Sequence, residues 1–76
     1  MKTVWVTQIT SNMGTGIVVS ATEKGAFERV VDYCNGEWKY AMDGVPVPKD
    51  PDELVSQYFE QNTYESYKIE ESTVLE

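Results

Sequence analysis

The side chains that most often perform chemistry in proteins are scarce in this 76-residue chain. It contains no histidine, which removes Ser-His-Asp and Cys-His catalysis, histidine metal sites and the commonest general base near neutral pH. Its one cysteine, Cys34, has no histidine to activate it and falls on the apolar face of a predicted helix, so we expect it to be buried. A zinc site within the chain would need more such ligands. We therefore predict no catalytic residue, no cofactor and no metal ion in a protein that is not an enzyme.

Two short motifs resemble ligand sites but have a simpler explanation. The acidic residues Asp50, Asp52 and Glu53 surround a proline at the predicted start of a helix, where carboxylates cap backbone N–H groups and favour the helix dipole. The Gly-Thr-Gly sequence at residues 14–16 is only a fragment of a phosphate-binding motif, and a strand is predicted to follow it where such motifs need a helix. We expect helix capping in the first case and a hairpin loop in the second.

The aromatic side chains Trp5, Trp38 and Tyr40 have the character of a stacking platform for single-stranded nucleic acid. Such platforms lie among positive charges, whereas the six basic residues of this chain are spread along its length. We therefore expect these rings to pack in the core or on the sheet, with some aromatic residues exposed for contact with proteins.

The C-terminal segment combines acidic and aromatic residues. The simpler interpretation is that these residues form the solvated face of an ordinary strand. The alternative is that they form a docking surface for a basic groove of a partner protein. An extreme form would mimic nucleic-acid phosphates with carboxylates. The candidate interaction residues are Glu60, Tyr64, Glu65, Tyr67, Glu70 and Glu71.

The formal net charge of −7 is unevenly distributed. Residues 1–36 carry three basic and three acidic side chains, whereas residues 37–76 carry three basic and ten acidic side chains. Such a charge repels nucleic acid and anionic membranes and attracts basic partners. The chain also has no signal-like N-terminal segment and no run of about 20 apolar residues that could span a membrane. With a lone cysteine, these features predict a cytoplasmic protein.

The first half of the chain predicts a hairpin followed by a helix. Residues 3–10 and 17–21 are rich in β-branched side chains, and the short turn-rich segment between them favours antiparallel pairing. Thr22, or alternatively Ser20, can cap the helix, and Asn35-Gly36 is expected to end it. One apolar face is expected along this helix, formed by Ala26, Phe27, Val30, Val31 and Cys34.

The second half predicts a strand, a helix and a final strand. Residues 37–42 alternate in polarity, Asp43-Gly44 is a strong turn, and residues 45–47 could form a brief edge segment. Asp50 as cap and Pro51 at the first helical position mark the next helix, which Asn62 ends. Residues 63–75 are expected to be extended, whereas Leu75-Glu76 could be a cloning remnant.

These elements together predict one α+β domain over residues 1–76. The expected order is β-β-α-β-α-β, with a small antiparallel sheet of three to four strands and two helices packed on one of its faces. The function most consistent with this composition is a protein-binding accessory module. The alternatives are an inhibitor of a nucleic-acid-handling enzyme, such as a phage counter-defence protein, a small-ligand binder, and a homodimer that covers the open face of the sheet.

Overall fold

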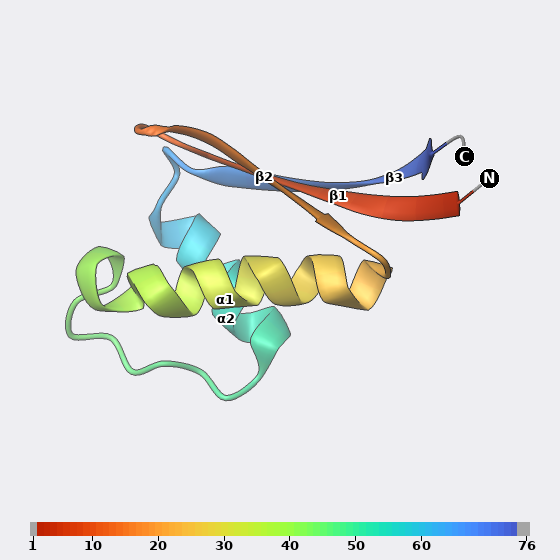
Figure 1. The fold of residues 1–76 in the computed structure, drawn as a ribbon. Coiled ribbons are helices and arrows are strands. Elements are labelled where there is room, and N and C mark those ends of the chain that lie inside the picture. Colours follow the sequence, from red (N-terminus) through yellow and green to blue (C-terminus); the bar gives the residue numbers. More distant parts are fainter. Residues whose placement is uncertain (1, 75–76) are drawn as a thin grey trace.

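The computed structural model describes residues 2–74 and contains two helices and three strands (Figure 1). In chain order these are β1 (Lys2–Ser11), β2 (Gly14–Ser20), α1 (Glu23–Ala41), α2 (Pro51–Gln61) and β3 (Ser66–Val74). The α+β class and the antiparallel sheet are confirmed, but the order is β-β-α-α-β because one predicted strand is absent. Residue 75 of the predicted final strand, together with Glu76, lies outside the described residues.

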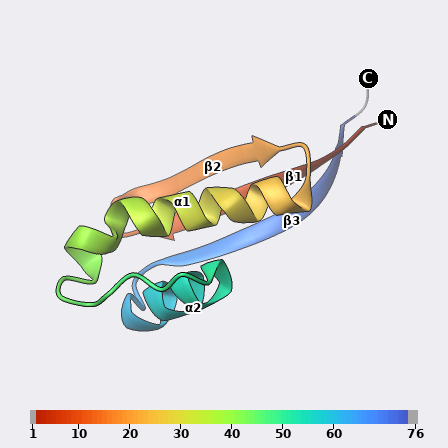
Figure 2. The same ribbon diagram turned by 90° about the horizontal axis from the view of Figure 1, so that it is seen from below.

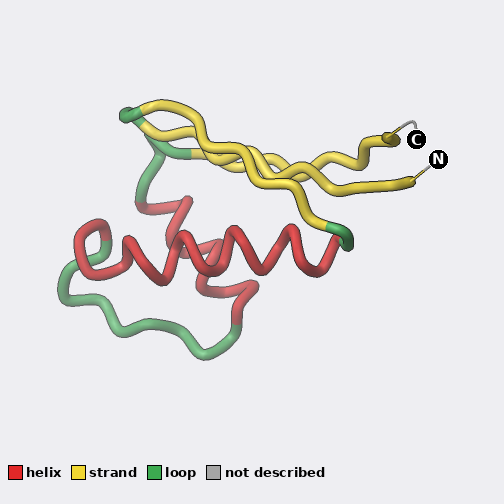
Figure 3. The backbone as a smooth tube through the Cα atoms, in the orientation of Figure 1, coloured by secondary structure: helices red, strands yellow, loops and turns green. Residues whose placement is uncertain are grey.

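The sheet has the strand order β2-β1-β3, and both neighbouring pairs are antiparallel. Both helices lie on one face of it and leave the other face open (Figures 1 and 3). The register places Thr7 of β1 beside Val18 and Ile69. Because the Thr7 hydroxyl donates a hydrogen bond to the Ala26 carbonyl of α1 at 3.0 Å, these three residues identify the face that carries the helices.

The prediction of a strand over residues 37–42 is wrong, because α1 continues through Asn35-Gly36 to Ala41. Trp38 and Met42 follow Cys34 at intervals of four, so they extend the buried stripe of a helix as well as they alternate in a strand. Both side chains are buried, whereas Tyr40 is 77% exposed. Burial of two large apolar side chains outweighs the roughly 1 kcal/mol that a glycine costs inside a helix.

The segment between the helices is a loop, so the predicted edge segment at residues 45–47 does not form. The indole N–H of Trp38 donates a hydrogen bond to the Val45 carbonyl at 2.7 Å and ties this loop to α1. The predicted turn at Asp43-Gly44 is present, with Gly44 at φ 83°, a conformation that glycine adopts without steric cost.

The start of both helices is confirmed as predicted. Thr22 caps α1 by accepting a hydrogen bond from the Gly25 N–H at 3.0 Å, and Asp50 caps α2 by accepting one from the Asp52 N–H at 3.2 Å. Asn62 is the C-cap of α2. The acidic motif at residues 50–53 therefore stabilises a helix N-terminus.

The hairpin turn is tighter than predicted. Residues 14–16 belong to β2, so the Gly-Thr-Gly motif is the start of a strand and only Asn12-Met13 form the turn. Gly14 has φ 125°, which explains a glycine directly after the turn because other residues rarely adopt this angle.

The core lies between the two helices and the covered face of the sheet. Cys34 is fully buried, as predicted. Phe27, Val31, Phe59 and Ile69 are partly buried against the same cluster. The fully enclosed members are Val30, Cys34, Trp38, Met42, Leu54, Val55 and Tyr58.

Candidate protein-interaction surface

The six predicted interaction residues lie at the end of α2, in the turn before β3 and in β3 itself. Tyr64 is 87% exposed in the turn before β3, and Glu60 is exposed at the end of α2. Tyr67 lies against Phe59, with ring centroids 5.0 Å apart, on the face that carries the helices. Glu70 and Glu71 are consecutive in β3 and so point to opposite faces of the sheet. The strand geometry therefore separates Glu70 from Glu71.

Glu65 joins α1, α2 and the start of β3 through its carboxylate. This carboxylate accepts hydrogen bonds from the Tyr33 hydroxyl and from the Tyr58 hydroxyl, the latter at 3.1 and 3.2 Å. The two tyrosine rings meet edge to face with centroids 5.8 Å apart. Glu65 is thus partly buried and hydrogen-bonded to both helices.

Burial sets the titration of the groups around Glu65. Burial, reinforced by the hydrogen bond to Glu65, raises the pKa of Tyr33 to about 12. Burial is also the main reason why the pKa of Tyr58 is raised, and it raises the pKa of the Cys34 thiol to about 12. All three groups are therefore neutral at physiological pH, and Cys34 is not a thiolate nucleophile.

The other carboxylates of the second half are distributed over several elements. They lie in α1, in the loop after it, at both ends of α2 and in β3. The described carboxylates thus come from several separate elements of the chain. Trp5, Trp38 and Tyr40 are also separated, because Trp38 is buried in the core while Tyr40 is exposed.

The longest run of uncharged residues in the chain forms the hairpin of β1 and β2. Residues 3–22 contain no acidic or basic side chain. Ile17 and Val19 of β2 are 64% and 61% exposed on the open face, where Val19 lies opposite Val6 of β1. The hairpin was not identified as a candidate surface from the sequence, because only the sum of the charges over residues 1–36 was considered, and that sum is zero. The absence of any charged residue between positions 3 and 22 was the pattern that could have identified it.

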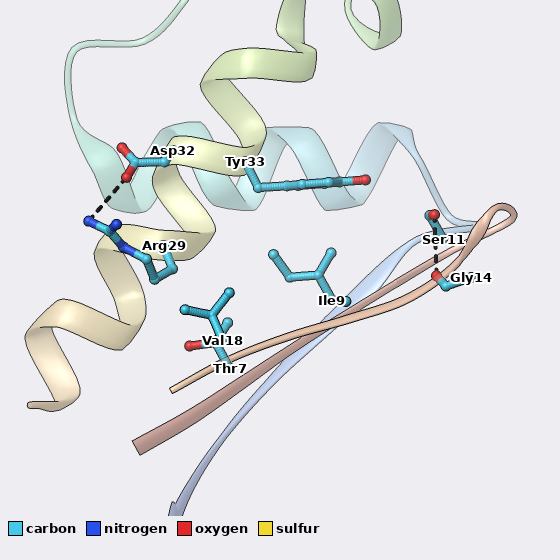
Figure 4. A pocket seen from close by; sticks show the side chains of 9 residues that line it. Thr7, Ile9, Ser11, Gly14, Val18, Arg29, Asp32 and Tyr33 are labelled. Atoms are coloured by element: carbon cyan, nitrogen blue, oxygen red, sulfur yellow. Dashed lines mark hydrogen bonds and ion pairs between the residues drawn. The ribbon is translucent and has the colours of Figure 1, made fainter. Parts of the chain in front are cut away.

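A groove of about 420 Å³ runs between β2 and α1 on the other face of the hairpin. Figure 4 shows Ile9 and Val18 on its sheet side, with Tyr33 and the paired Arg29 and Asp32 on α1. The Arg29 guanidinium and the Asp32 carboxylate are 3.2 Å apart. The groove thus has an apolar floor and one neutralised pair of charges at its upper rim.

The glycines of β2 keep this groove open along the edge of the sheet. Gly14 and Gly16 line it, and a Cβ atom added to either would meet nothing within 4 Å.

Among residues 2–74, no group of three or more histidine, cysteine or acidic residues is arranged to hold a metal ion. None of the helices in that range combines the length and the apolarity needed to cross a membrane.

Comparison with protein-family models, with curated proteins and with solved structures found no match for this chain. Its function must therefore be argued from the geometry described above.

Proposed function

We propose that the chain is a non-enzymatic protein-binding module and that the edge of β2 is its docking element. The observation that carries this proposal is the difference between the two edges of the sheet. β2 is an edge strand of seven residues without a charge or a proline. β3 forms the opposite edge and contains Lys68, Glu70 and Glu71.

Edge strands carry unpaired backbone N–H and C=O groups that can pair with a strand of another chain. Charged side chains are a common protection against such pairing. The charges of β3 provide it, whereas β2 exposes Ile17 and Val19 on one side and Val18 on the other. An unprotected apolar edge beside an open groove is typical of proteins that accept an extended strand from a partner.

The edge of β2 supports protein binding better than the acidic residues support mimicry of nucleic acid. The described carboxylates occupy different elements, and Glu65 is held by two tyrosine hydroxyls. The neutral hairpin exposes the apolar side chains of Ile17, Val18 and Val19 along its edge strand β2.

Site-specific photo-crosslinking in the cells that produce the chain tests this proposal. A benzophenone side chain at position 17 of β2 is expected to form discrete adducts with protein, and the same side chain at position 72 of β3 is the matched control. Both positions are exposed on the open face of the sheet, on opposite edge strands. Equal crosslinking at the two positions, or none at position 17, would refute a docking role for β2.

A further inference from the structure

The charges of this molecule restrict what can occupy the edge of β2. A basic partner would be attracted to carboxylates, and residues 3–22 contain none. Each chain has a net charge of −7, and in a contact between two copies the hairpins themselves contribute no carboxylate. An antiparallel pairing of one strand with its own copy is also compatible with twofold symmetry.

We infer that a second copy of the chain occupies the edge of β2, so that two β2 strands pair antiparallel and the Arg29 and Asp32 side chains of the two copies form reciprocal ion pairs above them. This inference rests on the proposed function and names the occupant of its docking edge. The resulting sheet has six strands, with both protected β3 strands at its outer edges. The twofold axis is perpendicular to the sheet, so all four helices lie on one face.

The central residue of β2 is Ile17, and the ion pair of α1 lies level with it. Gly25 of α1 lies beside Ser20 of β2, because a Cβ atom on Gly25 would be 3.6 Å from the Ser20 Cβ. Three strand residues from Ser20 to Ile17 span about 10 Å, which corresponds to about seven residues of a helix. Seven residues after Gly25 is Asp32, so a twofold axis through Ile17 passes close to Asp32 and one helical turn from Arg29.

The spacing between the two α1 helices suits these side chains. Each α1 lies over its central strand β1, where Thr7 contacts Ala26 (Figure 2). The two β1 strands of the dimer are three strand spacings apart, about 14 Å, whereas closely packed helices are about 8–10 Å apart. The remaining gap needs long side chains, and Arg29 of one copy can cross it to Asp32 of the other copy.

The charges at this junction are self-complementary. Each copy contributes one cation and one anion, so the four-charge cluster is neutral, and both side chains are solvent-accessible in the single chain. Exposed ion pairs contribute little affinity, so backbone pairing and the apolar side chains of β2 supply most of the affinity of the dimer. The ion pairs fix the register, because a wrong charge at either position places like charges together.

A charge-swap experiment on the full chain tests the inference. Sedimentation equilibrium at micromolar concentration is expected to give the wild type twice the chain mass of 8.6 kDa. Arg29→Asp alone places four acidic side chains at the junction, and Asp32→Arg alone places four basic ones, so each is expected to weaken the dimer at least about tenfold. An equimolar mixture of the two variants is expected to restore a dimer, because each acidic pair then meets a basic pair.

The Lys68 and Glu70 side chains of β3 provide the matched control. They form a second exposed ion pair, with 2.7 Å between the ammonium and carboxylate atoms, on the edge that the dimer leaves free. Lys68→Asp changes the net charge by the same amount as Arg29→Asp, and it is expected to leave the dimer unchanged. Circular dichroism is used to check that each variant is folded.

The outcomes separate this inference from the proposed function. A monomeric wild type, or a mixture of the two variants that remains monomeric while the wild type is a dimer, overturns the reciprocal arrangement. If the wild type is monomeric and position 17 still crosslinks to a different protein, β2 remains a docking element and only its occupant is wrong. If it is monomeric and position 17 crosslinks to nothing, both proposals fail.

Discussion

At the scale of single residues, the partly buried Glu65 shows how an acidic residue can connect two helices of an acidic protein. Its carboxylate accepts hydrogen bonds from two tyrosine hydroxyls that come from different helices. Glu65→Gln keeps the shape but leaves one acceptor oxygen for two hydroxyls. We expect the free energy of unfolding to fall by about 1–3 kcal/mol, measured by urea denaturation. Glu60→Gln, at an exposed position, is the control and is expected to change it by less than about 0.5 kcal/mol.

The same substitution has a spectroscopic consequence that simple loss of packing would not produce. Burial and then the hydrogen bond to Glu65 raise the pKa of Tyr33 to about 12. Glu65→Gln removes the second cause and leaves the first, so the pKa of Tyr33 is expected to move toward its ordinary value of about 10. Ultraviolet titration of the folded protein measures this shift, and an unchanged tyrosine titration would contradict the role given to Glu65.

The raised pKa of Tyr33 also predicts how stability depends on pH. Between its unfolded value of 10.0 and its folded value of about 12, the unfolded chain loses a proton that the folded chain keeps. The stabilisation is therefore fully present below pH 10 and declines as the pH rises through 12. Cys34 acts in the same direction from its ordinary value of 9.0. The slope above pH 10 is expected to be smaller in the Glu65→Gln variant.

At the scale of elements, the sequence correctly predicted the features that depend only on neighbouring residues. Thr22 and Asp50 cap their helices, Asn62 ends α2, and the hairpin pairs antiparallel, because these features need only neighbouring residues. The end of α1 could not be predicted in this way. Asn35-Gly36 favours a stop locally, and only the packing of Trp38 against α2 and the loop outweighs it.

The candidate site was harder to predict because the faces of the strands depend on register. A strand over residues 63–75 already implies that Glu70 and Glu71 point to opposite faces, but the sequence alone does not show which of the two faces the helices cover. It also does not show that Glu65 reaches tyrosines on both helices, since Tyr33 is 32 positions away. The residues of the hairpin edge became a candidate only once β2 was placed at the outside of the sheet.

The unexpected continuation of α1 yields a prediction for this helix. Gly36 lies within α1, away from both ends of the helix, and is exposed to solvent. A Cβ atom added to it would meet nothing within 4 Å. Gly36→Ala is therefore expected to raise the free energy of unfolding by about 0.5–1 kcal/mol, since alanine restricts the unfolded chain and favours the helix. Thermal or urea denaturation measures the change. If the helix ended at residue 35 as the sequence suggested, the same substitution would destabilise the protein instead.

At the scale of the whole molecule, the chain separates its charge from its apolar surface. The hairpin is neutral, while the helices, the connecting loop and β3 hold nearly all of the charges. A domain of this size buries only about 60% of the surface that its unfolded chain exposes and is marginally stable alone. Pairing through β2 would cover exposed apolar surface, and the two Asp32 carboxylates that it brings together would be balanced by the two Arg29 guanidinium groups, so association and stability should be linked.

This linkage can be measured through the melting temperature. If folding and dimerisation are coupled, the melting temperature of the wild type is expected to rise with chain concentration, because mass action favours the dimer. Arg29→Asp is expected to show a lower melting temperature that no longer depends on concentration over the same range. Lys68→Asp should retain the concentration dependence, since its charge lies on the free edge of the sheet. A wild-type melting temperature that is constant over a hundredfold range of concentration would show that each chain folds and melts alone, and that β2 does not pair with its own copy.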